Sequence, residues 1–235
     1  MNTREFLKRY IWVYCYVVTF FLGCAALLLH SVEAADSVQS FNLHPIIIID
    51  PGHGAPDGGA TGISGVREDR VNLDISRRLE ALLALLGCEC VMTRCDGNCI
   101  ATEGSTIRQK KQSDLQSRVN LVNSHPSAVL VSIHQNHFPD GRYHGPQVFW
   151  ADGGEALAKN MQTALSDALS PQSRRSAKRA AGVYLMEHID HPGILVECGF
   201  LSNPQEEQLL ASGAYQKKIA AVLAGVLANY VHPGV

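Results

Sequence analysis

The sequence lacks an excess of charge of either sign. Its 235 residues carry 20 Lys and Arg against 22 Asp and Glu, which gives a formal net charge of -2. Without a basic field there is no electrostatic basis for binding nucleic acid, so we expect no nucleic-acid partner. Internal repeats and low-complexity tracts are also absent. The length and the 46% of hydrophobic residues suit one domain of ordinary size with a tail.

The N-terminal segment is apolar behind a basic start. Three basic residues come first: Arg4, Lys8 and Arg9. Residues 10–29 are then uncharged and mostly apolar. About 20 such residues are enough for a helix to span a bilayer. Positive charge ahead of this run predicts that the following chain lies outside the cytoplasm.

The sequence leaves two fates of this segment open. A retained helix would anchor the protein to the membrane, whereas the small-residue pattern at 32–34 is typical of a signal-peptide cleavage site. We expect residues 1–34 to be a membrane anchor or a signal peptide, residues 35–44 a linker, and residues 45–235 the catalytic domain. In both cases the domain is exported, as a secreted or an anchored protein.

Two kinds of apolar segment alternate along the domain. Short apolar runs predict strands at 46–49, 88–93, 128–133, 147–150, 183–186 and 194–197. Helical spacing of apolar residues predicts helices at 71–86, 114–123, 155–169, 204–210 and 215–230. This alternation predicts an α/β fold: a single domain with a mostly parallel central sheet flanked by helices, preceded by the N-terminal hydrophobic helix.

Three polar positions share one place relative to the expected strands. The pair Asp50 and His53, then His134, and then Glu197 each stand at or just after the end of an apolar strand. The carboxyl ends of parallel strands form the edge where open α/β sheets bind ligands. The topology therefore predicts that these groups converge.

Histidine and carboxylate side chains at such an edge suit a catalytic zinc ion. Zinc in hydrolases takes three such ligands and leaves a fourth position open. His53, Glu68 and His134 supply that set, and Glu197 supplies a carboxylate to move protons. The sequence has no H-E-x-x-H helix. A lone histidine after a strand is more often a satisfied structural group, so the prediction depends on the whole constellation.

Seven cysteines offer a rival site. Cys88, Cys90, Cys95 and Cys99 are crowded together, but the C-x-C spacing is not one that zinc sites use. Cys95 and Cys99 could close a small loop in an exported protein, although pairing cannot be deduced from sequence. We expect these thiols, free or paired, to have no catalytic role.

Four short motifs follow one another along the domain. Residues 50–54 with 57–60 form the first, and Glu68 stands three positions before the triplet 71–73. Residues 132–136 surround the second histidine, and residues 196–203 surround Glu197. In sequence and order they resemble the motifs of the zinc-dependent N-acetylmuramoyl-L-alanine amidases, over roughly residues 45–232.

This resemblance implies a reaction and a role for each residue. His53, Glu68 and His134 would be ligands of Zn²⁺, and Glu197 the catalytic acid and base. The family cuts the amide between the lactyl group of N-acetylmuramic acid and the L-alanine of the stem peptide. The expected partner is therefore peptidoglycan, its glycan strands with their stem peptides.

A narrower resemblance concerns three further segments. Residues 108–118, 145–149 and 174–178 are similar to the spore-cortex amidases that act for germination. That subfamily removes stem peptides so that muramic-δ-lactam can form. The resemblance implies a place in the spore cortex or intermembrane space, and an accessory regulatory protein as a further partner. A general vegetative cell-wall amidase is the alternative.

Two residues depart from the family pattern. Asp69 stands where the family commonly has lysine, and as a second carboxylate it competes with Glu68 for the metal. His137 replaces a small residue and is either a rim residue or a spare ligand. The segment 135–146 is too short for the inhibitory helix of some relatives, so we expect an open cleft. A zinc peptidase or deacetylase, and a non-enzymatic wall-binding module, remain rival hypotheses.

Overall fold

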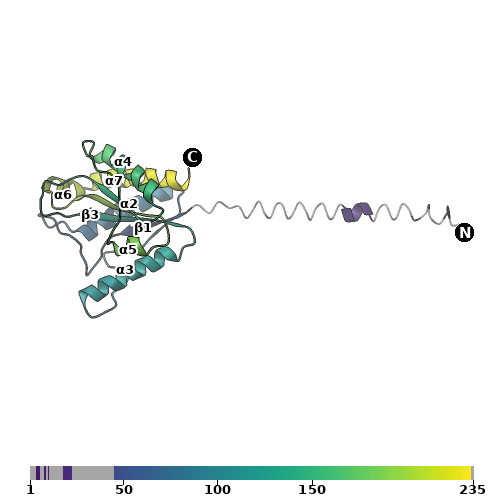
Figure 1. Cartoon of the computed structure of the whole chain (residues 1–235), viewed down its shortest axis with the longest axis horizontal. Helices are drawn as coiled ribbons and strands as arrows, with labels where there is room; N and C mark the ends of the chain where they lie inside the picture. The colour runs from purple at the N-terminus through teal and green to yellow at the C-terminus, as the bar shows by residue number, and fades with distance from the viewer. Residues whose placement is uncertain (1–3, 6–7, 9, 11–17, 23–44, 234–235) are drawn as a thin grey trace. The chain divides into compact units, whose positions relative to one another are not determined.

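The computed structural model of the protein describes residues 4, 5, 8, 10, 18–22 and 45–233 (Figure 1). The predicted anchor or signal peptide at 1–34 and the linker at 35–44 lie almost entirely outside the described residues. Among those that are described, no helix is both long and apolar enough to cross a membrane. The chain from His44 to Val235 forms one compact unit.

Six strands form one sheet in the order β2-β1-β3-β6-β4-β5. β1, β2, β3 and β6 pair in parallel, whereas β4 runs antiparallel to β6 and parallel to β5. The mostly parallel sheet confirms the predicted fold class. The strands are β1 (Ile46–Pro51), β2 (Cys90–Met92), β3 (Ala128–Asn136), β4 (Gln147–Trp150), β5 (Lys178–Arg179) and β6 (Gly193–Phe200).

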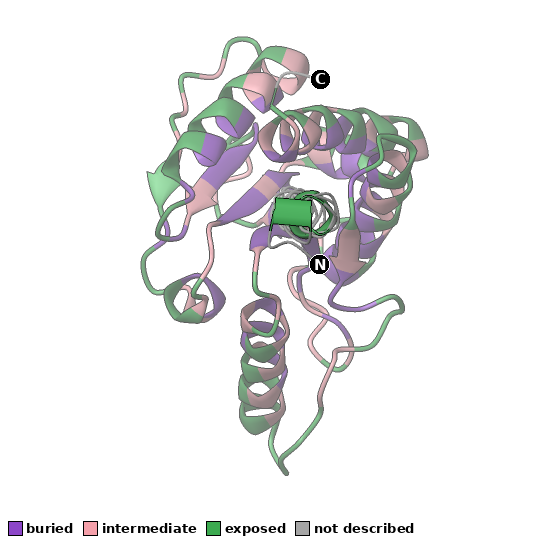
Figure 2. Cartoon of the chain, turned by 90° about the vertical axis from the view of Figure 1, so that its right-hand side faces the viewer, coloured by how far each residue is buried: buried purple, intermediate pink, exposed green. Residues whose placement is uncertain are grey.

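Helices cover both faces of the sheet, with α4 and α7 on one side and α3 and α5 on the other (Figure 1). One face packs on α2 (Glu68–Leu85), α4 (Glu155–Leu169) and α7 (Gly213–Val231). The opposite face packs on α3 (Ile107–Asn123) and α5 (Tyr184–His188), and α6 (Pro204–Leu210) follows β6. Buried residues line the strands and the inner sides of the helices (Figure 2). This covering explains the continuous apolar runs, because each central strand is buried on both faces.

The predicted strand at 183–186 is wrong, because this segment forms helix α5. Leu, Met and Glu are strong helix formers, and one helical turn buries Leu185 and Met186 while Glu187 faces solvent. The short strand β5 was not predicted. It consists of two exposed basic residues at the sheet edge, and an edge strand of this kind carries no apolar signal.

Several boundaries also differ from the prediction. α3 begins at Ile107 rather than near 114, because Thr106 and Gln109 form a capping box that starts the helix earlier. β3 continues through His134 to Asn136, and β6 continues past Glu197 to Phe200. His134 and Glu197 therefore lie within strands, which hold both side chains on a rigid backbone.

Candidate metal centre

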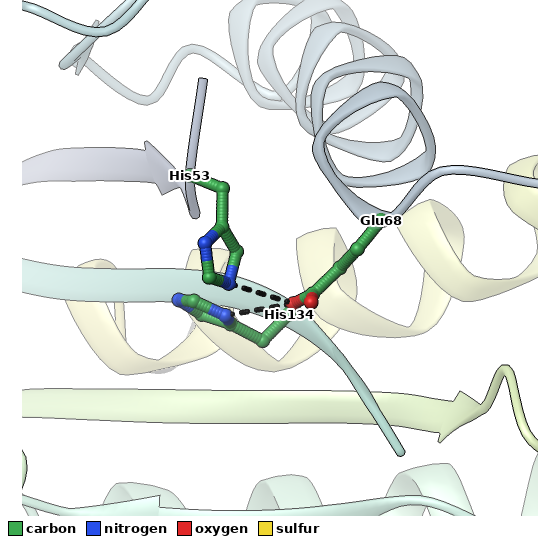
Figure 3. A group of neighbouring side chains, drawn as sticks. All are labelled: His53, Glu68 and His134. Atoms are coloured by element: carbon green, nitrogen blue, oxygen red, sulfur yellow. Dashed lines mark hydrogen bonds and ion pairs between the residues drawn. The ribbon is translucent and has the colours of Figure 1, made fainter. Parts of the chain in front are cut away.

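Three side chains from distant segments meet at the carboxyl edge of the sheet (Figure 3). His53 Nε2 lies 3.2 Å from Glu68 Oε1, and His134 Nδ1 lies 3.0 Å from the same oxygen. One donor atom from each residue falls within 4.8 Å of the other two. The predicted convergence of His53, Glu68 and His134 is therefore present in the structure.

The backbone after β1 is shaped to place the ring of His53. A side chain on Gly52 would come within 2.2 Å of the His134 ring, so the position requires glycine. His53 itself has φ +62°, which is rare for a residue with a β-carbon. Its carbonyl oxygen accepts a hydrogen bond from Arg118 Nη2 at 2.7 Å. Arg118 thus stabilises a conformation that the local sequence alone disfavours.

A second carboxylate fixes the orientation of the His53 ring. His53 Nδ1 hydrogen-bonds to Asp57 Oδ2 at 3.1 Å, which leaves Nε2 facing Glu68. Lys111 Nζ lies 3.0 Å from the same Asp57 oxygen. Burial opposes a charge on His53, but the hydrogen bonds to Asp57 and Glu68 outweigh it and raise its pKa to about 9. This role of Asp57 was not predicted from the sequence, although the first motif contains the residue.

Glu68 opens α2, and its carboxylate is held on several sides. Oε2 accepts the backbone N–H of Ala60 at 2.8 Å, and Oε1 accepts that of Gln135 at 3.1 Å. Burial raises the pKa of Glu68, but hydrogen bonds from the two histidines lower it more, so the net shift is strongly downward. The carboxylate is therefore charged and oriented toward both histidines.

The competing carboxylate points elsewhere. Asp69 makes a bidentate pair with Arg67, at 2.9 Å and 2.8 Å. It lies outside the group of donor atoms that His53, Glu68 and His134 form. Of the two adjacent carboxylates, Glu68 lies within this group of donor atoms and Asp69 lies outside it.

Glu197 faces this group from β6. It is the register partner of His134 on β3, and the charges of His134, Glu68 and His53 all act on it. Burial raises its pKa to about 7, against the charge of His134. Its Oε2 is buried and has no hydrogen-bond partner among the described residues. A buried carboxylate oxygen without a partner is costly unless it is used.

Beneath the site lies a buried ionic network centred on Arg118. Its guanidinium pairs with Asp50 and with Asp114, and also donates to the carbonyl of Pro51. Asp50 further accepts hydrogen bonds from Thr93 and Ser132. Arg118, Asp50 and Asp114 are all buried, so the loop that carries His53 is fixed from below.

Other candidates from the sequence lie outside the group. His137 is exposed, and in the described part of the chain His53, Glu68 and His134 are the one set that could hold a metal ion. All five cysteines from Cys88 onward are free. Residues 137–146 form turns and bends without a helix.

The donor set fits a zinc ion. Two imidazole nitrogens and one carboxylate oxygen are typical catalytic zinc ligands, and bonds of 2.0–2.2 Å in a tetrahedron separate such ligands by about 3.4 Å. The separations of 3.2 Å and 3.0 Å are close to this value. Asp57 on the far nitrogen of His53 provides the outer contact that such ligands usually have.

Fold and site together define an α/β protein with a histidine–carboxylate group suited to a metal, placed at the ligand-binding edge of its sheet. Residues 47–229 match the family model described as N-acetylmuramoyl-L-alanine amidase. The chain belongs to this family and is an N-acetylmuramoyl-L-alanine amidase, an enzyme of peptidoglycan.

Individual relatives agree with this assignment. The chain is 38% identical over 194 residues to the germination-specific N-acetylmuramoyl-L-alanine amidase of Bacillus subtilis, covering 80% of this chain and 81% of that protein. It is 28% identical to the amidase LytC of the same organism, covering 85% of this chain but spanning only 38% of LytC. The solved structure of the CwlD amidase of Clostridioides difficile, in complex with the GerS lipoprotein, is similar with a TM-score of 0.76 and 32% identity, covering 80% of this chain and 98% of that one.

Proposed function

We propose that the protein is a zinc-dependent amidase in which His53, Glu68 and His134 hold the metal and Glu197 transfers protons. The observation that carries the proposal is the group of three donor atoms within 4.8 Å, faced by an unpartnered carboxylate oxygen of Glu197. A bound zinc ion supplies a Lewis acid that acidifies water to a pKa of about 7 and polarises a carbonyl group.

The chain's own residues divide the remaining work. Asp57 holds the His53 ring so that Nε2 faces the metal position. Glu197 Oε2 accepts the proton of the attacking water and delivers it to the nitrogen that leaves with L-alanine. A pKa raised toward neutrality suits a carboxylate that must both accept and donate a proton.

Removal of zinc with a chelator, followed by re-addition, tests this function on purified peptidoglycan. We expect release of peptides with N-terminal L-alanine to stop without zinc and to resume with it. Full activity in the metal-free protein would contradict the proposal. Release of acetate or of single amino acids, with the muramyl–alanine bond intact, would favour a deacetylase or a peptidase instead.

We further propose that the substrate is spore-cortex peptidoglycan, where peptide removal precedes formation of muramic-δ-lactam. The 38% identity to a germination-specific amidase supports this role over that of a general vegetative amidase. Spores that lack the protein should contain no muramic-δ-lactam on muropeptide analysis. Normal levels of muramic-δ-lactam in such spores would instead favour a general vegetative cell-wall amidase.

The same relatives bear on partners and location. Because a similar amidase was solved in complex with a lipoprotein, we propose that an accessory protein regulates this one. We also propose that residues 45–235 are the catalytic domain and act outside the cytoplasm, after export directed by residues 1–34. Pull-down from sporulating cells and N-terminal sequencing of the mature protein test these two points.

A further inference from the structure

A basic groove lies beside the metal centre. It encloses about 530 Å³. We use the name basic groove for the surface whose lining includes Arg142, Tyr143, Gln147, Arg174, Arg175 and Lys178. None of these residues has a role in the proposed hydrolysis.

The topology of the sheet places the basic groove at the catalytic edge. β4 runs antiparallel to β6, and β5 runs parallel to β4. The N-terminal ends of β4 and β5 therefore lie at the same edge as the carboxyl ends of β1, β3 and β6. Gln147 begins β4, lines the groove, and is the register partner of Glu197. The basic groove thus lies at the end of the strand that neighbours Glu197, although Glu197 itself does not line it.

Two basic side chains of the groove, Arg174 and Lys178, have no carboxylate partner among the described residues. Arg142, by contrast, pairs with Asp140 at 2.6 Å. Among the described residues, Arg174, Arg175 and Lys178 form no close ion pair, although the charge of Glu206 acts on Arg175. In a chain whose net charge is -2, this local excess creates a field that attracts anions.

Arg175 lies over an aromatic ring that is itself stacked on a second one. Its guanidinium carbon lies 5.1 Å from the centroid of the Phe200 ring, and Tyr143 stacks on the same ring at 6.2 Å. Phe200 ends β6, three residues after Glu197. A guanidinium placed in this way loses little conformational freedom when it binds a carboxylate.

We propose that the basic groove binds the carboxylates of the stem peptide, on the leaving-group side of the scissile amide. The inference rests on the proposed amidase reaction and adds a subsite to it. An N-acetylated glycan strand is uncharged, whereas a stem peptide carries free carboxylates, so charge distinguishes the two halves of the substrate. The cavity of about 310 Å³ beside His53 mixes Lys111 and Asp114 with apolar residues and offers no such excess.

Matched muropeptides test the proposal on the zinc-loaded full-length chain. One substrate is a tetrasaccharide muropeptide with tetrapeptide stems, and the other is the same compound after its carboxylates are converted to amides. We expect the wild type to prefer the acidic substrate about fivefold or more in kcat/KM, chiefly through KM. The variant Arg174→Gln/Lys178→Gln should lose this preference, while its kinetics on the amidated substrate stay unchanged.

Arg179→Gln is the control, because Arg179 adjoins Lys178 in the chain but pairs with Asp152 and does not line the groove. It should keep the wild-type preference. Arg174 and Lys178 are exposed, so the melting temperature of the double variant should stay within about 2 °C of the wild type. Arg175→Gln, assayed in parallel, should weaken the preference on its own.

Equal kcat/KM of the wild type on both substrates would overturn the subsite, as would a double variant that retains the preference. Both outcomes leave the amidase reaction intact. If the wild type releases peptide from neither substrate in the presence of zinc, the proposed function itself fails. The two failures are therefore distinguishable.

Discussion

His134 on β3 and Glu197 on β6 stand opposite each other in the register of two adjacent parallel strands. Parallel strands pair through regularly spaced hydrogen bonds, so their separation is fixed by the sheet and not by flexible loops. The register thus sets one candidate metal ligand beside the candidate proton carrier. Glu68 and His53 reach the same point from outside the sheet, at the start of α2 and in the loop after β1.

The substitution Glu197→Gln removes the carboxylate that is proposed to carry the proton and keeps the shape of the side chain. Because the amide neither accepts nor delivers the proton, we expect kcat to fall by about 10²- to 10⁴-fold. Zinc content should stay at one ion per chain, since Glu197 lies outside the donor group. Turnover and metal analysis on the same preparation measure both effects.

Glu103→Gln provides the matched control, as the same chemical change at an exposed glutamate. It should leave kcat unaltered. A Glu197→Gln enzyme with wild-type kcat would show that Glu197 does not transfer the proton.

Asp57→Asn tests the orientation of His53. The amide oxygen can still accept a hydrogen bond, but it no longer supplies the negative charge that favours metal binding through the imidazole. Loss of such an outer carboxylate weakens zinc affinity by about tenfold or more. Competition with a chromogenic chelator measures the affinity, and exposed Asp152→Asn serves as the control. Equal zinc affinity in both variants would contradict the role of Asp57.

Arg118→Met tests the ionic network under the site. The change leaves Asp50 and Asp114 buried without their counter-charge and frees the carbonyl of His53. Breaking a buried pair in this way should lower the free energy of unfolding by about 3–5 kcal/mol. Urea unfolding measures the loss. Arg108→Met, an exposed arginine of the same helix, should change stability by less than about 0.5 kcal/mol.

The same network predicts how stability depends on pH. Burial raises the pKa of Asp50, but the charge of Arg118 and hydrogen bonds from Ser132 and Thr93 outweigh it and lower the pKa to about 2. A folded-state pKa below the unfolded value of about 3.9 gives stability that is present above that value and is lost as pH falls toward 2.

The stability advantage of the wild type over Asp50→Asn should therefore be greatest near pH 5–7. It should shrink by on the order of 2 kcal/mol as the pH falls from 5 to 2. Urea titrations at a series of pH values check this. A constant difference across the range would show that Asp50 has an ordinary pKa in the folded state.

The sequence predicted the parts of the fold whose hydrophobic pattern reflects burial. Continuous apolar runs at β1, β3 and β6 indicated strands buried on both faces, and the positions of His53, His134 and Glu197 relative to them indicated the common edge. The prediction of Glu68 depended more on the motif, with the adjacent Asp69 as its competitor. Asp69 instead forms a bidentate pair with Arg67, a contact that depends on the three-dimensional path of the loop.

Other features carry no one-dimensional signal. The strand β5 is polar and two residues long, and α5 is five residues long, too short for the spacing of its apolar residues to distinguish a helix from a strand. The partners of Arg118 could not be named, because Asp50 lies 68 residues away in the chain. The neighbourhood of Arg175 and Phe200 arises only when the loop after α4 returns to the sheet edge.

Anomalous diffraction from zinc-loaded crystals of the protein tests the central claim most directly. Data on both sides of the zinc absorption edge locate the ion without reference to its ligands. The account predicts one peak within about 2.0–2.2 Å of His53 Nε2, Glu68 Oε1 and His134 Nδ1. A peak at the cysteines between Cys88 and Cys99, or no ordered zinc at these three residues, would contradict it.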